Sequence, residues 1–245
     1  MLLRVSGDLF AKGFGDPPFD VLALPGWMRT VADYDQTLRD FAALAIDLPG
    51  FGGAQAPPSS AWSTGQYAEA LLPALEAFAT PPVLVGHSFG GRVALQLATM
   101  RPDAIRALVL TGVPELIAHD KSKPNFLHRS IRALHRRGLV SNARLELWKG
   151  QHGSADYRNA TGVMRDILVK AVSENYEAQL RSLSVPTTFI WGENDTAAPL
   201  TDVEQALELV PAGTATLKIL KGVGHLTPLE APDAIASAIR DRLLA

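Results

Sequence analysis

Short apolar runs alternate with amphipathic stretches along most of the chain. Nearly continuous apolar runs are typical of strands in a parallel sheet, because such a sheet is buried on both faces. The predicted strands are residues 21–24, 44–48, 83–86, 107–111, 187–191 and 215–220. The predicted helices lie between them, at residues 34–41, 64–78, 89–100, 200–209 and 232–244. This alternation predicts an α/β fold with a doubly wound, mostly parallel sheet, which binds its ligand at the carboxyl ends of the strands.

The alternation stops between residues 114 and 184. That segment is polar, has helical spacing, and contains no strand-like run. Pro114 and Pro186 mark breaks near its two edges. We therefore expect a helical cap, residues 114–184, inserted into a core formed by residues 1–113 and 185–245.

The composition is that of a globular protein and narrows the function. The chain has 245 residues, 47% of them hydrophobic, and a formal net charge of −2, so we expect neither nucleic-acid binding nor a membrane-surface role. No apolar run is long enough for a transmembrane helix, and the first residues do not resemble a signal peptide. The sequence has no cysteine, which excludes disulfides, thiolate metal sites and a cysteine nucleophile. We expect a cytoplasmic protein that needs no metal or cofactor.

The segment Gly-His-Ser-Phe-Gly-Gly at residues 86–91 is the most informative motif. It follows an apolar run and opens a helical stretch, and a strand that turns into a helix at G-x-S-x-G is typical of a nucleophile elbow. The small residues around Ser88 leave room for strand and helix to close on each other. The motif therefore predicts Ser88 as a nucleophile. The alternative is a serine that only caps the helix.

A serine nucleophile needs a base, and His225 is the predicted one. It follows the last predicted strand in a loop with glycines before it and Pro228 after it. His87 adjoins Ser88, but neighbouring strand residues point to opposite faces, so we interpret it as structural. The other four histidines all lie in the predicted cap.

The base needs an acid that accepts its second N–H, and Asp195 is the first candidate. It follows the predicted strand 187–191, so it would lie at the carboxyl edge of the sheet. An aspartate there could instead cap the next helix. Glu115, after the strand 107–111, ranks second, and Glu193 ranks third. The order serine, acid, histidine along the chain is the one expected for such a site.

Two backbone amides are predicted to form an oxyanion hole. The amide of Phe89 follows the nucleophile and opens a helix, so it faces developing negative charge favourably. The amide of Trp27 follows Gly26, directly after the predicted strand 21–24. A plain proline-glycine turn with a packed tryptophan is the alternative for Trp27.

Taken together, these motifs resemble the α/β-hydrolase fold superfamily over nearly the whole chain. The resemblance rests on Leu-Pro-Gly-Trp at 24–27, Asp-Leu-Pro-Gly-Phe-Gly-Gly at 47–53, the segment 86–91, Trp-Gly-Glu-Asn-Asp at 191–195 and Gly-His at 224–225. It implies a sheet of about eight strands and a triad of Ser88, Asp195 and His225, with Trp27 and Phe89 giving the oxyanion amides. It also implies that the loop at Asp47 supports the oxyanion turn without doing chemistry. Many members have His-Gly where this chain has Pro25 and Gly26, so the bonds supporting the oxyanion turn must differ.

The leading hypothesis is a cofactor-free serine hydrolase that cleaves a carboxylic ester of a small or medium-sized molecule through an acyl-enzyme. A cap suits such substrates better than polymers. The fold supports many reactions, so alternatives stay open. These are lactone or thioester hydrolysis, hydrolysis of a C–C bond in an acidic diketone, a small-molecule receptor on a hydrolase scaffold, and a subunit that works only in a complex. The oligomeric state is not predicted.

The predicted cap carries a positive local charge. Residues 120–149 hold eight Lys or Arg residues against two acidic ones. Such a surface attracts anionic molecules, which favours a carboxylate-bearing substrate, an acyl-carrier thioester or an acidic partner. A solvated helix face explains the same charges, so an anionic substrate is one of two interpretations.

Overall fold

The computed structural model describes residues 2–6, 9–58, 60–117, 141 and 155–245. Its strands form one eight-stranded sheet in the order β1-β2-β4-β3-β5-β6-β7-β8. β1 and β2 are antiparallel, β2 is antiparallel to β4, and all later neighbours are parallel. The strands are β1 (Leu2–Ser6), β2 (Leu9–Phe14), β3 (Val21–Leu24), β4 (Ala43–Ile46), β5 (Val83–His87), β6 (Ala107–Thr111), β7 (Thr187–Gly192) and β8 (Ala215–Leu220). The predicted doubly wound, mostly parallel sheet is confirmed.

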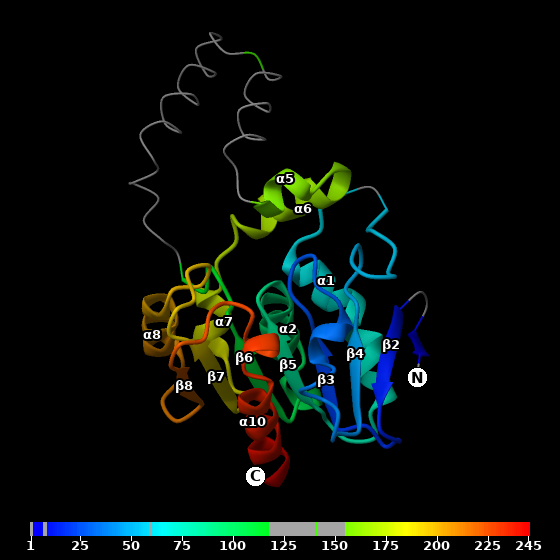
Figure 1. The fold of residues 1–245 in the computed structure, drawn as a ribbon, viewed down its shortest axis with the longest axis vertical. Coiled ribbons are helices and arrows are strands. Elements are labelled where there is room, and N and C mark those ends of the chain that lie inside the picture. Colours follow the sequence, from blue (N-terminus) through cyan, green and yellow to red (C-terminus); the bar gives the residue numbers. More distant parts are fainter. Residues whose placement is uncertain (1, 7–8, 59, 118–140, 142–154) are drawn as a thin grey trace.

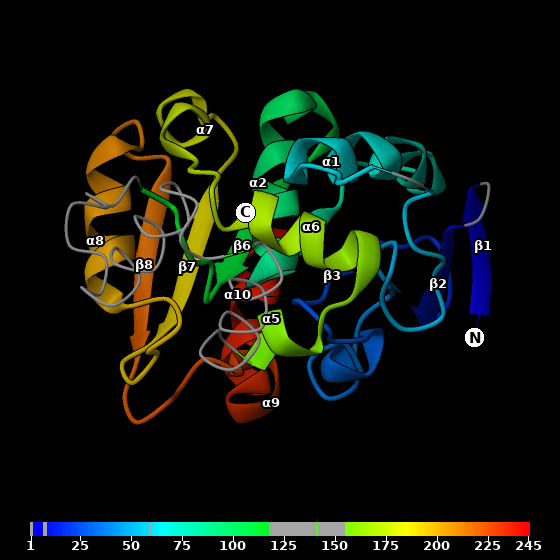
Figure 2. The same cartoon turned by 90° about the horizontal axis from the view of Figure 1, so that it is seen from above.

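Helices cover both faces of this sheet (Figures 1 and 2). Within the described residues, the α-helices are α1 (Thr64–Leu71), α2 (Phe89–Met100), α5 (Ala155–Asn159), α6 (Gly162–Ala171), α7 (Glu177–Ser182), α8 (Leu200–Leu209), α9 (Thr227–Glu230) and α10 (Pro232–Leu244). The same part of the chain contains the short 3-10 helices η1 (Val31–Tyr34), η2 (Leu72–Ala77) and η3 (Pro102–Ala104). Figure 2 shows α1, α2, α7 and α8 on one face, with α9 and α10 on the other.

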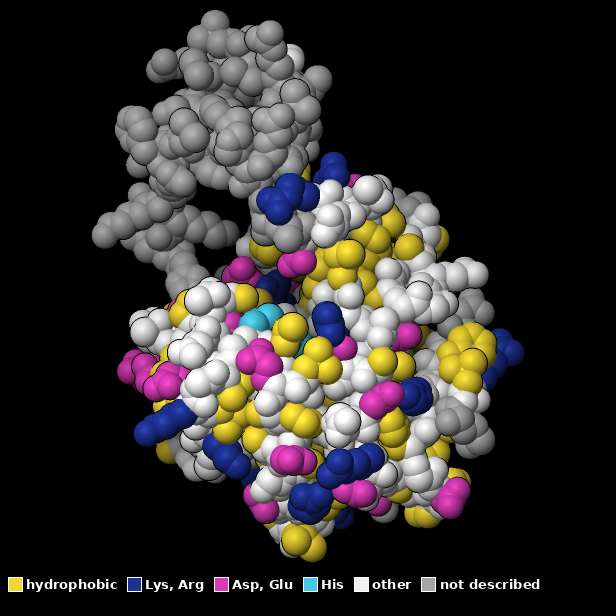
Figure 3. Space-filling model, viewed as in Figure 1, with side chains coloured by type: hydrophobic (Ala, Val, Ile, Leu, Met, Phe, Trp, Pro, Cys, Tyr) yellow, Lys and Arg dark blue, Asp and Glu magenta, His cyan; other side chains and the backbone are white. Residues whose placement is uncertain are grey.

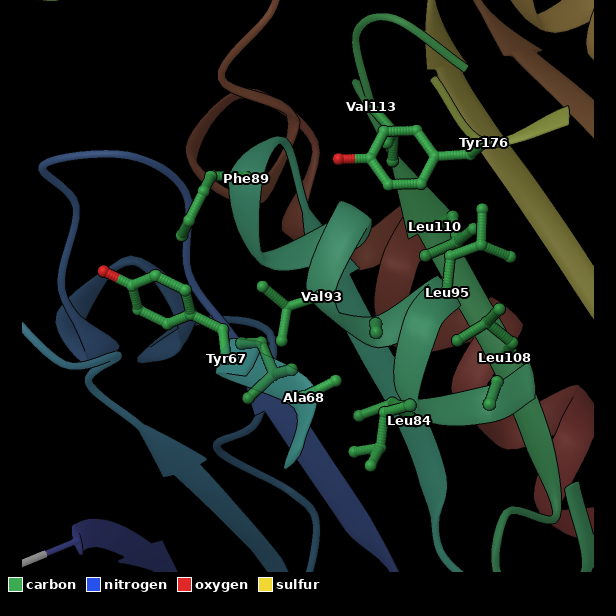
Figure 4. Packing of buried hydrophobic residues seen from close by; sticks show 14 of the residues in the cluster. Tyr67, Ala68, Leu84, Phe89, Val93, Leu95, Leu108, Leu110, Val113 and Tyr176 are labelled. Carbon is green, nitrogen blue, oxygen red and sulfur yellow. The ribbon is translucent and has the colours of Figure 1, made fainter. Parts of the chain in front are cut away.

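Two apolar cores follow from this layering, because alternate residues of each strand point to opposite faces. One core packs the face covered by α1 and α2 and includes Leu84, Phe89 and Leu110. Figure 4 shows α2 lying between α1 and β6 within this core. The other core packs the opposite face of the sheet and includes Val85 of β5 and Ile239 of α10. Burial on both faces explains why these strands are nearly continuous apolar runs.

Two features differ from the expected elements. The sequence did not predict β1 and β2, which lie at the edge of the sheet and leave Leu2 and Phe10 largely exposed, so their pattern is not a continuous apolar run. The expected helix 34–41 is wrong as well. Tyr34 and Leu38 are buried with helical spacing, but the chain there forms only η1 followed by separate hydrogen-bonded turns.

The described part of the predicted cap is helical. It contains α5, α6 and α7, and α5 and α6 lie beyond the sheet edge in Figure 1 and over the middle of the sheet in Figure 2. Residues 118–140 and 142–154, which include most of the basic stretch 120–149, lie outside the described residues. The division into a core and a cap spanning 114–184 therefore stays a prediction.

Helix α6 is joined to α2 by a buried cation. The side chain of Arg92 on α2 donates a hydrogen bond of 2.9 Å to the carbonyl of Ala171, the last residue of α6. It also pairs with the carboxylate of Glu115, which follows β6. Because Arg92 is only 4% exposed, these two partners offset part of the cost of burying its charge, while its Nε has no hydrogen-bond partner among the described residues.

The close contact between β3 and α2 predicts which glycines tolerate a side chain. A Cβ atom on Gly90 would collide with the backbone carbonyls of Leu24 and Pro25, whereas one on Gly53 would meet no described atom within 4 Å. We expect Gly90→Ala to lower the free energy of unfolding by about 3 kcal/mol or to prevent folding, because backbone cannot yield as a side chain can. Gly53→Ala is the control and should change stability by less than about 0.5 kcal/mol in urea denaturation. Equal stability of the two variants would contradict the packing described.

Candidate active site

Ser88 occupies a strained turn between β5 and α2. Its φ of 50° and ψ of −116° are unusual for a residue with a side chain. The turn is held because the Ser88 N–H donates to the carbonyl of Thr111 at 3.0 Å, and the N–H of Arg92 donates to the Ser88 carbonyl at 3.1 Å. A Cβ on Gly86 would lie 2.6 Å from the Cα of Gly91, so only a glycine fits the inner side of the turn. This is the geometry that the G-x-S-x-G motif predicts.

The three predicted catalytic side chains lie in one hydrogen-bonded line. His225 Nε2 is 3.1 Å from Ser88 Oγ, and His225 Nδ1 is 2.8 Å from Asp195 Oδ2. The other carboxylate oxygen of Asp195 accepts the N–H groups of Ala197 at 2.9 Å and Ala198 at 2.8 Å. Because an ionised carboxylate can only accept hydrogen bonds, Nδ1–H of the imidazole donates to Asp195, and this leaves Nε2 to accept the hydrogen bond of the Ser88 hydroxyl.

The two alternative acids are engaged elsewhere. Glu115 pairs with Arg92, as described above. Glu193 accepts the N–H of Gly222 at 3.3 Å. Of the three acids considered from the sequence, Asp195 is therefore the one that the structure brings to the imidazole of His225.

The two predicted oxyanion amides belong to segments that lie close to Ser88. A Cβ on Gly26, the residue before Trp27, would lie 3.3 Å from Ser88 Cβ. Phe89 is the first residue of α2, where backbone N–H groups have no acceptor within the helix. Both amides stay predictions, because their role depends on a bound oxyanion.

The loop after β3 is supported by hydrogen bonds to two side chains. The N–H of Val31 donates to Asp47 Oδ1 at 2.8 Å, and the hydroxyl of Tyr34 donates to the carbonyl of Leu24 at 3.0 Å. Asp47 comes from the Asp-Leu-Pro-Gly-Phe-Gly-Gly segment, so that segment does support the loop that carries Trp27.

An aromatic cluster adjoins the nucleophile turn. The rings of Trp27, Phe51 and Phe89 pack edge to face in all three pairs, with centroids 4.8, 5.2 and 5.9 Å apart. Tyr67 extends the cluster, with its ring 5.1 Å from that of Phe89. The two residues with predicted oxyanion amides are thus held together by their own side chains, each pair contributing about 1 kcal/mol beyond apolar burial.

Glu230 is a residue of this site that the sequence reasoning missed. Its carboxylate accepts two backbone N–H groups, from Gly224 at 2.7 Å and from Leu226 at 2.9 Å, which flank His225. An acidic residue one short turn after a candidate base was the available signal, but nothing in a single sequence distinguishes it from a solvated glutamate.

His87 packs against the candidate base from the buried side. Its ring centroid is 5.0 Å from that of His225, and its Nδ1–H donates to the carbonyl of Thr111 at 3.2 Å. Burial, and secondly the charged form of His225, lower the pKa of His87 to about 3. His87 is thus a neutral wall beside the site, which agrees with the structural interpretation made from the sequence.

The described residues give no sign of a metal site. Within them, no three side chains of the metal-binding types come close enough to hold an ion. Likewise, no helix of the described chain is long and apolar enough to cross a membrane.

Figure 3 shows basic and acidic side chains interspersed on one face, with histidine visible at its surface. The side chain of His225 is 26% exposed, so solvent and small molecules reach the candidate base.

Comparisons with family models, curated proteins and solved structures all find similarity to hydrolases. A model described as "Alpha/beta hydrolase family" matches residues 21–238. The chain is 26% identical to a 2-hydroxymuconate semialdehyde hydrolase of Pseudomonas putida, over 82% of this chain and 76% of that protein. It is 24% identical to a pimeloyl-[acyl-carrier protein] methyl ester esterase of Nitrosospira multiformis, over 78% of this chain and 81% of that protein. Among solved structures it is similar to a putative lipase from Acinetobacter baumannii, with a TM-score of 0.71 and 19% identity over 100% of this chain and 90% of that one.

The lowered pKa of His87 makes stability depend on pH. Below about pH 6.5 the unfolded chain protonates this residue, whereas the native protein does not do so until about pH 3, so stability falls as the pH falls through this range. In His87→Asn this contribution is absent. We expect the loss of unfolding free energy between pH 7 and pH 5 to be smaller in the variant by about 2 kcal/mol. Urea denaturation at both pH values measures it, and an identical loss in both proteins would contradict the buried neutral histidine.

Proposed function

The chain belongs to the alpha/beta hydrolase family and is a hydrolytic enzyme, and from this we propose that it is a serine hydrolase of small or medium-sized carboxylic esters. Ser88 is the nucleophile, His225 the general base and Asp195 the acid that orients it. The amides of Trp27 and Phe89 form the oxyanion hole. The reaction passes through an acyl-enzyme and needs no cofactor.

The observation that supports this proposal most is the continuous hydrogen-bonded line from the hydroxyl of Ser88 to the carboxylate of Asp195. A serine hydroxyl is a weak nucleophile at neutral pH unless a base removes its proton during attack. The side chain of Asp195 is fully buried, so its charge is poorly screened and stabilises the imidazolium that forms.

In the first half of the reaction, Ser88 Oγ attacks the ester carbonyl carbon while His225 Nε2 takes the hydroxyl proton. The carbonyl oxygen becomes an oxyanion that accepts the N–H groups of Trp27 and Phe89. Collapse of this intermediate breaks the bond to the alkoxy group, which takes the proton from His225 and leaves as the alcohol. The acyl group remains on Ser88.

In the second half, water replaces the alcohol. His225 accepts a proton from the water as its oxygen attacks the acyl carbon, and the same two amides stabilise the second oxyanion. Collapse releases the carboxylic acid, and the proton on His225 returns to Ser88 Oγ. One ester and one water thus give one acid and one alcohol, and the enzyme is regenerated.

The choice of an ester is supported by the relative named as a methyl ester esterase. Another relative is named as a semialdehyde hydrolase, so hydrolysis of a different bond is the second candidate. Lactone and thioester hydrolysis, a receptor role and an anionic substrate attracted by residues 120–149 stay untested predictions, as does a cytoplasmic location.

The nucleophile assignment predicts a large loss in one variant. We expect Ser88→Ala to lower kcat on short p-nitrophenyl esters by more than about 10³-fold, because the attacking oxygen is removed, while the far-UV circular dichroism stays unchanged. Ser182→Ala, an exposed serine on α7, is the matched control and should keep wild-type activity.

A covalent probe separates the alternatives. A fluorophosphonate should label the wild type at Ser88, as mapped by mass spectrometry, and should not label Ser88→Ala. Unchanged ester hydrolysis in Ser88→Ala would refute the mechanism. Labelling at Ser88 without turnover of esters would move the assignment to lactones, thioesters or C–C bonds, whereas saturable ligand binding with neither labelling nor turnover would favour a receptor.

A further inference from the structure

We propose that Glu230 is a positioning residue that holds the loop of His225 so that its imidazole lies in line between Ser88 and Asp195. This inference rests on the proposed function, which makes His225 the general base. Glu230 touches none of the proposed reacting atoms and acts through the backbone on either side of His225.

The two hydrogen bonds of Glu230 fix the backbone around the base. Oε2 accepts the N–H of Gly224 at 2.7 Å, and Oε1 accepts the N–H of Leu226 at 2.9 Å. The peptide unit after His225 is held at its other end too, because the His225 carbonyl accepts the N–H of Thr227 at 2.9 Å. With both ends of that peptide unit bound, the ψ angle of His225 and the direction of its side chain are constrained.

Glu230 is itself rigidly presented. It is the last residue of the short turn α9, and its own N–H donates to the carbonyl of Leu226 at 2.9 Å. A Cβ on Gly224 would lie 3.2 Å from each carboxylate oxygen of Glu230. Because glycine has no side chain, the carboxylate packs against residue 224 without a steric conflict. Glu230, Leu226 and Gly224 thus form a small closed unit around the base.

The same loop is tied on its other side to the loop that carries the acid. The N–H of Asn194 donates to the carbonyl of Val223 at 2.9 Å. Gly192, at the end of β7, lies against the backbone of Val223 and Gly224, where a Cβ would collide with both carbonyls. Asn194 therefore sets the distance of the His225 loop from Asp195, while Glu230 sets its orientation.

His225 needs such support because it is partly exposed and lies in a loop. Its side chain is 26% exposed and lies in a loop, where local opening costs less free energy than in the sheet. Its two ring nitrogens must reach two partners at once, at 2.8 and 3.1 Å. A displacement of about 1 Å at such a site lowers the rate by about 100-fold.

A carboxylate near an imidazole could also act by its charge, and substitution separates the two effects. Glu230→Gln removes the charge but keeps one acceptor oxygen for one of the two N–H groups. Glu230→Ala removes both acceptors. A positioning role predicts that activity decreases in the order wild type, Glu230→Gln, Glu230→Ala. A charge effect predicts that the two variants lose the same activity and that the acid limb of the pH–rate profile moves to lower pH in both.

The experiment measures kcat and KM on a short p-nitrophenyl ester for wild type, Glu230→Gln and Glu230→Ala, with Glu204→Gln and Glu204→Ala on the exposed face of α8 as controls. We expect kcat to fall by about 10-fold to 100-fold in Glu230→Ala and less in Glu230→Gln, with KM within about twofold and thermal melting little changed. The Glu204 variants should match the wild type. Activity is normalised to the fraction of protein that a fluorophosphonate labels.

A second readout does not depend on activity. We expect the imidazole N–H that His225 donates to Asp195 to give a far-downfield proton resonance in the wild type, to broaden or vanish in Glu230→Ala, and to persist in the Glu204 variants. Both readouts unchanged in Glu230→Ala would overturn the positioning role while leaving the serine mechanism intact. Equal losses of kcat in Glu230→Gln and Glu230→Ala, together with a shifted pH–rate profile, would overturn the positioning role and indicate that Glu230 acts by its charge. If the wild type turns over no ester, the proposed ester hydrolysis is refuted. The proton resonance then still shows whether Glu230 fixes the position of the His225 imidazole.

Discussion

The backbone turn at Ser88 is the constraint on which the rest of the structure depends. A residue with a side chain is held at a φ of 50°, and the hydrogen bond from its N–H to the Thr111 carbonyl is part of what keeps it there. Such a conformation costs about 1–3 kcal/mol and persists only where its surroundings determine it. Gly86 and Gly90 let β5, α2 and β3 pack so closely that side chains at these two positions would collide with backbone atoms. The backbone strain is therefore concentrated at Ser88, the residue whose hydroxyl faces His225.

The remaining parts of the site are placed by contacts between loops rather than within them. The Thr111 carbonyl accepts both the Ser88 N–H and the His87 ring, so the end of β6 fixes the nucleophile and the wall beside the base. The loops after β7 and β8 are joined through Asn194, and Glu230 closes the loop after β8. Each loop alone is a flexible connection, but the shared hydrogen bonds make them one unit at the carboxyl edge of the sheet.

Sequence reasoning works best here where a residue's role is set by its immediate neighbours. The parallel strands were predictable because burial on both faces makes them continuous apolar runs, and Ser88 was predictable because its turn needs glycines at fixed spacing. β1 and β2 escaped because they are the two outermost strands on one side of the sheet, where Leu2 and Phe10 are exposed and Ala11 is the one buried residue of β2, so neither strand is a continuous apolar run. The segment 34–41 shows the reverse error, since Tyr34 and Leu38 are spaced as on a helix and joined by one backbone hydrogen bond, but the chain there forms turns that do not continue into a helix. The engagement of Glu115 by Arg92, and of two backbone amides by Glu230, depends on contacts between distant segments, which no single sequence displays.

The bond from Arg92 to the last carbonyl of α6 ties the end of α6 to the helix that begins at the nucleophile turn. Lifting that end of α6 would take the Ala171 carbonyl away from a guanidinium that is almost wholly buried, and leaving a buried hydrogen-bonding group without its partner costs about 1–3 kcal/mol. The opposite end of α6 begins at Gly162, whose φ of 53° places it in a conformation that glycine adopts without strain. Helix α6 is therefore fastened to α2, the helix that begins at the nucleophile turn, by its last residue, whereas its first residue lies in a turn that glycine adopts without strain.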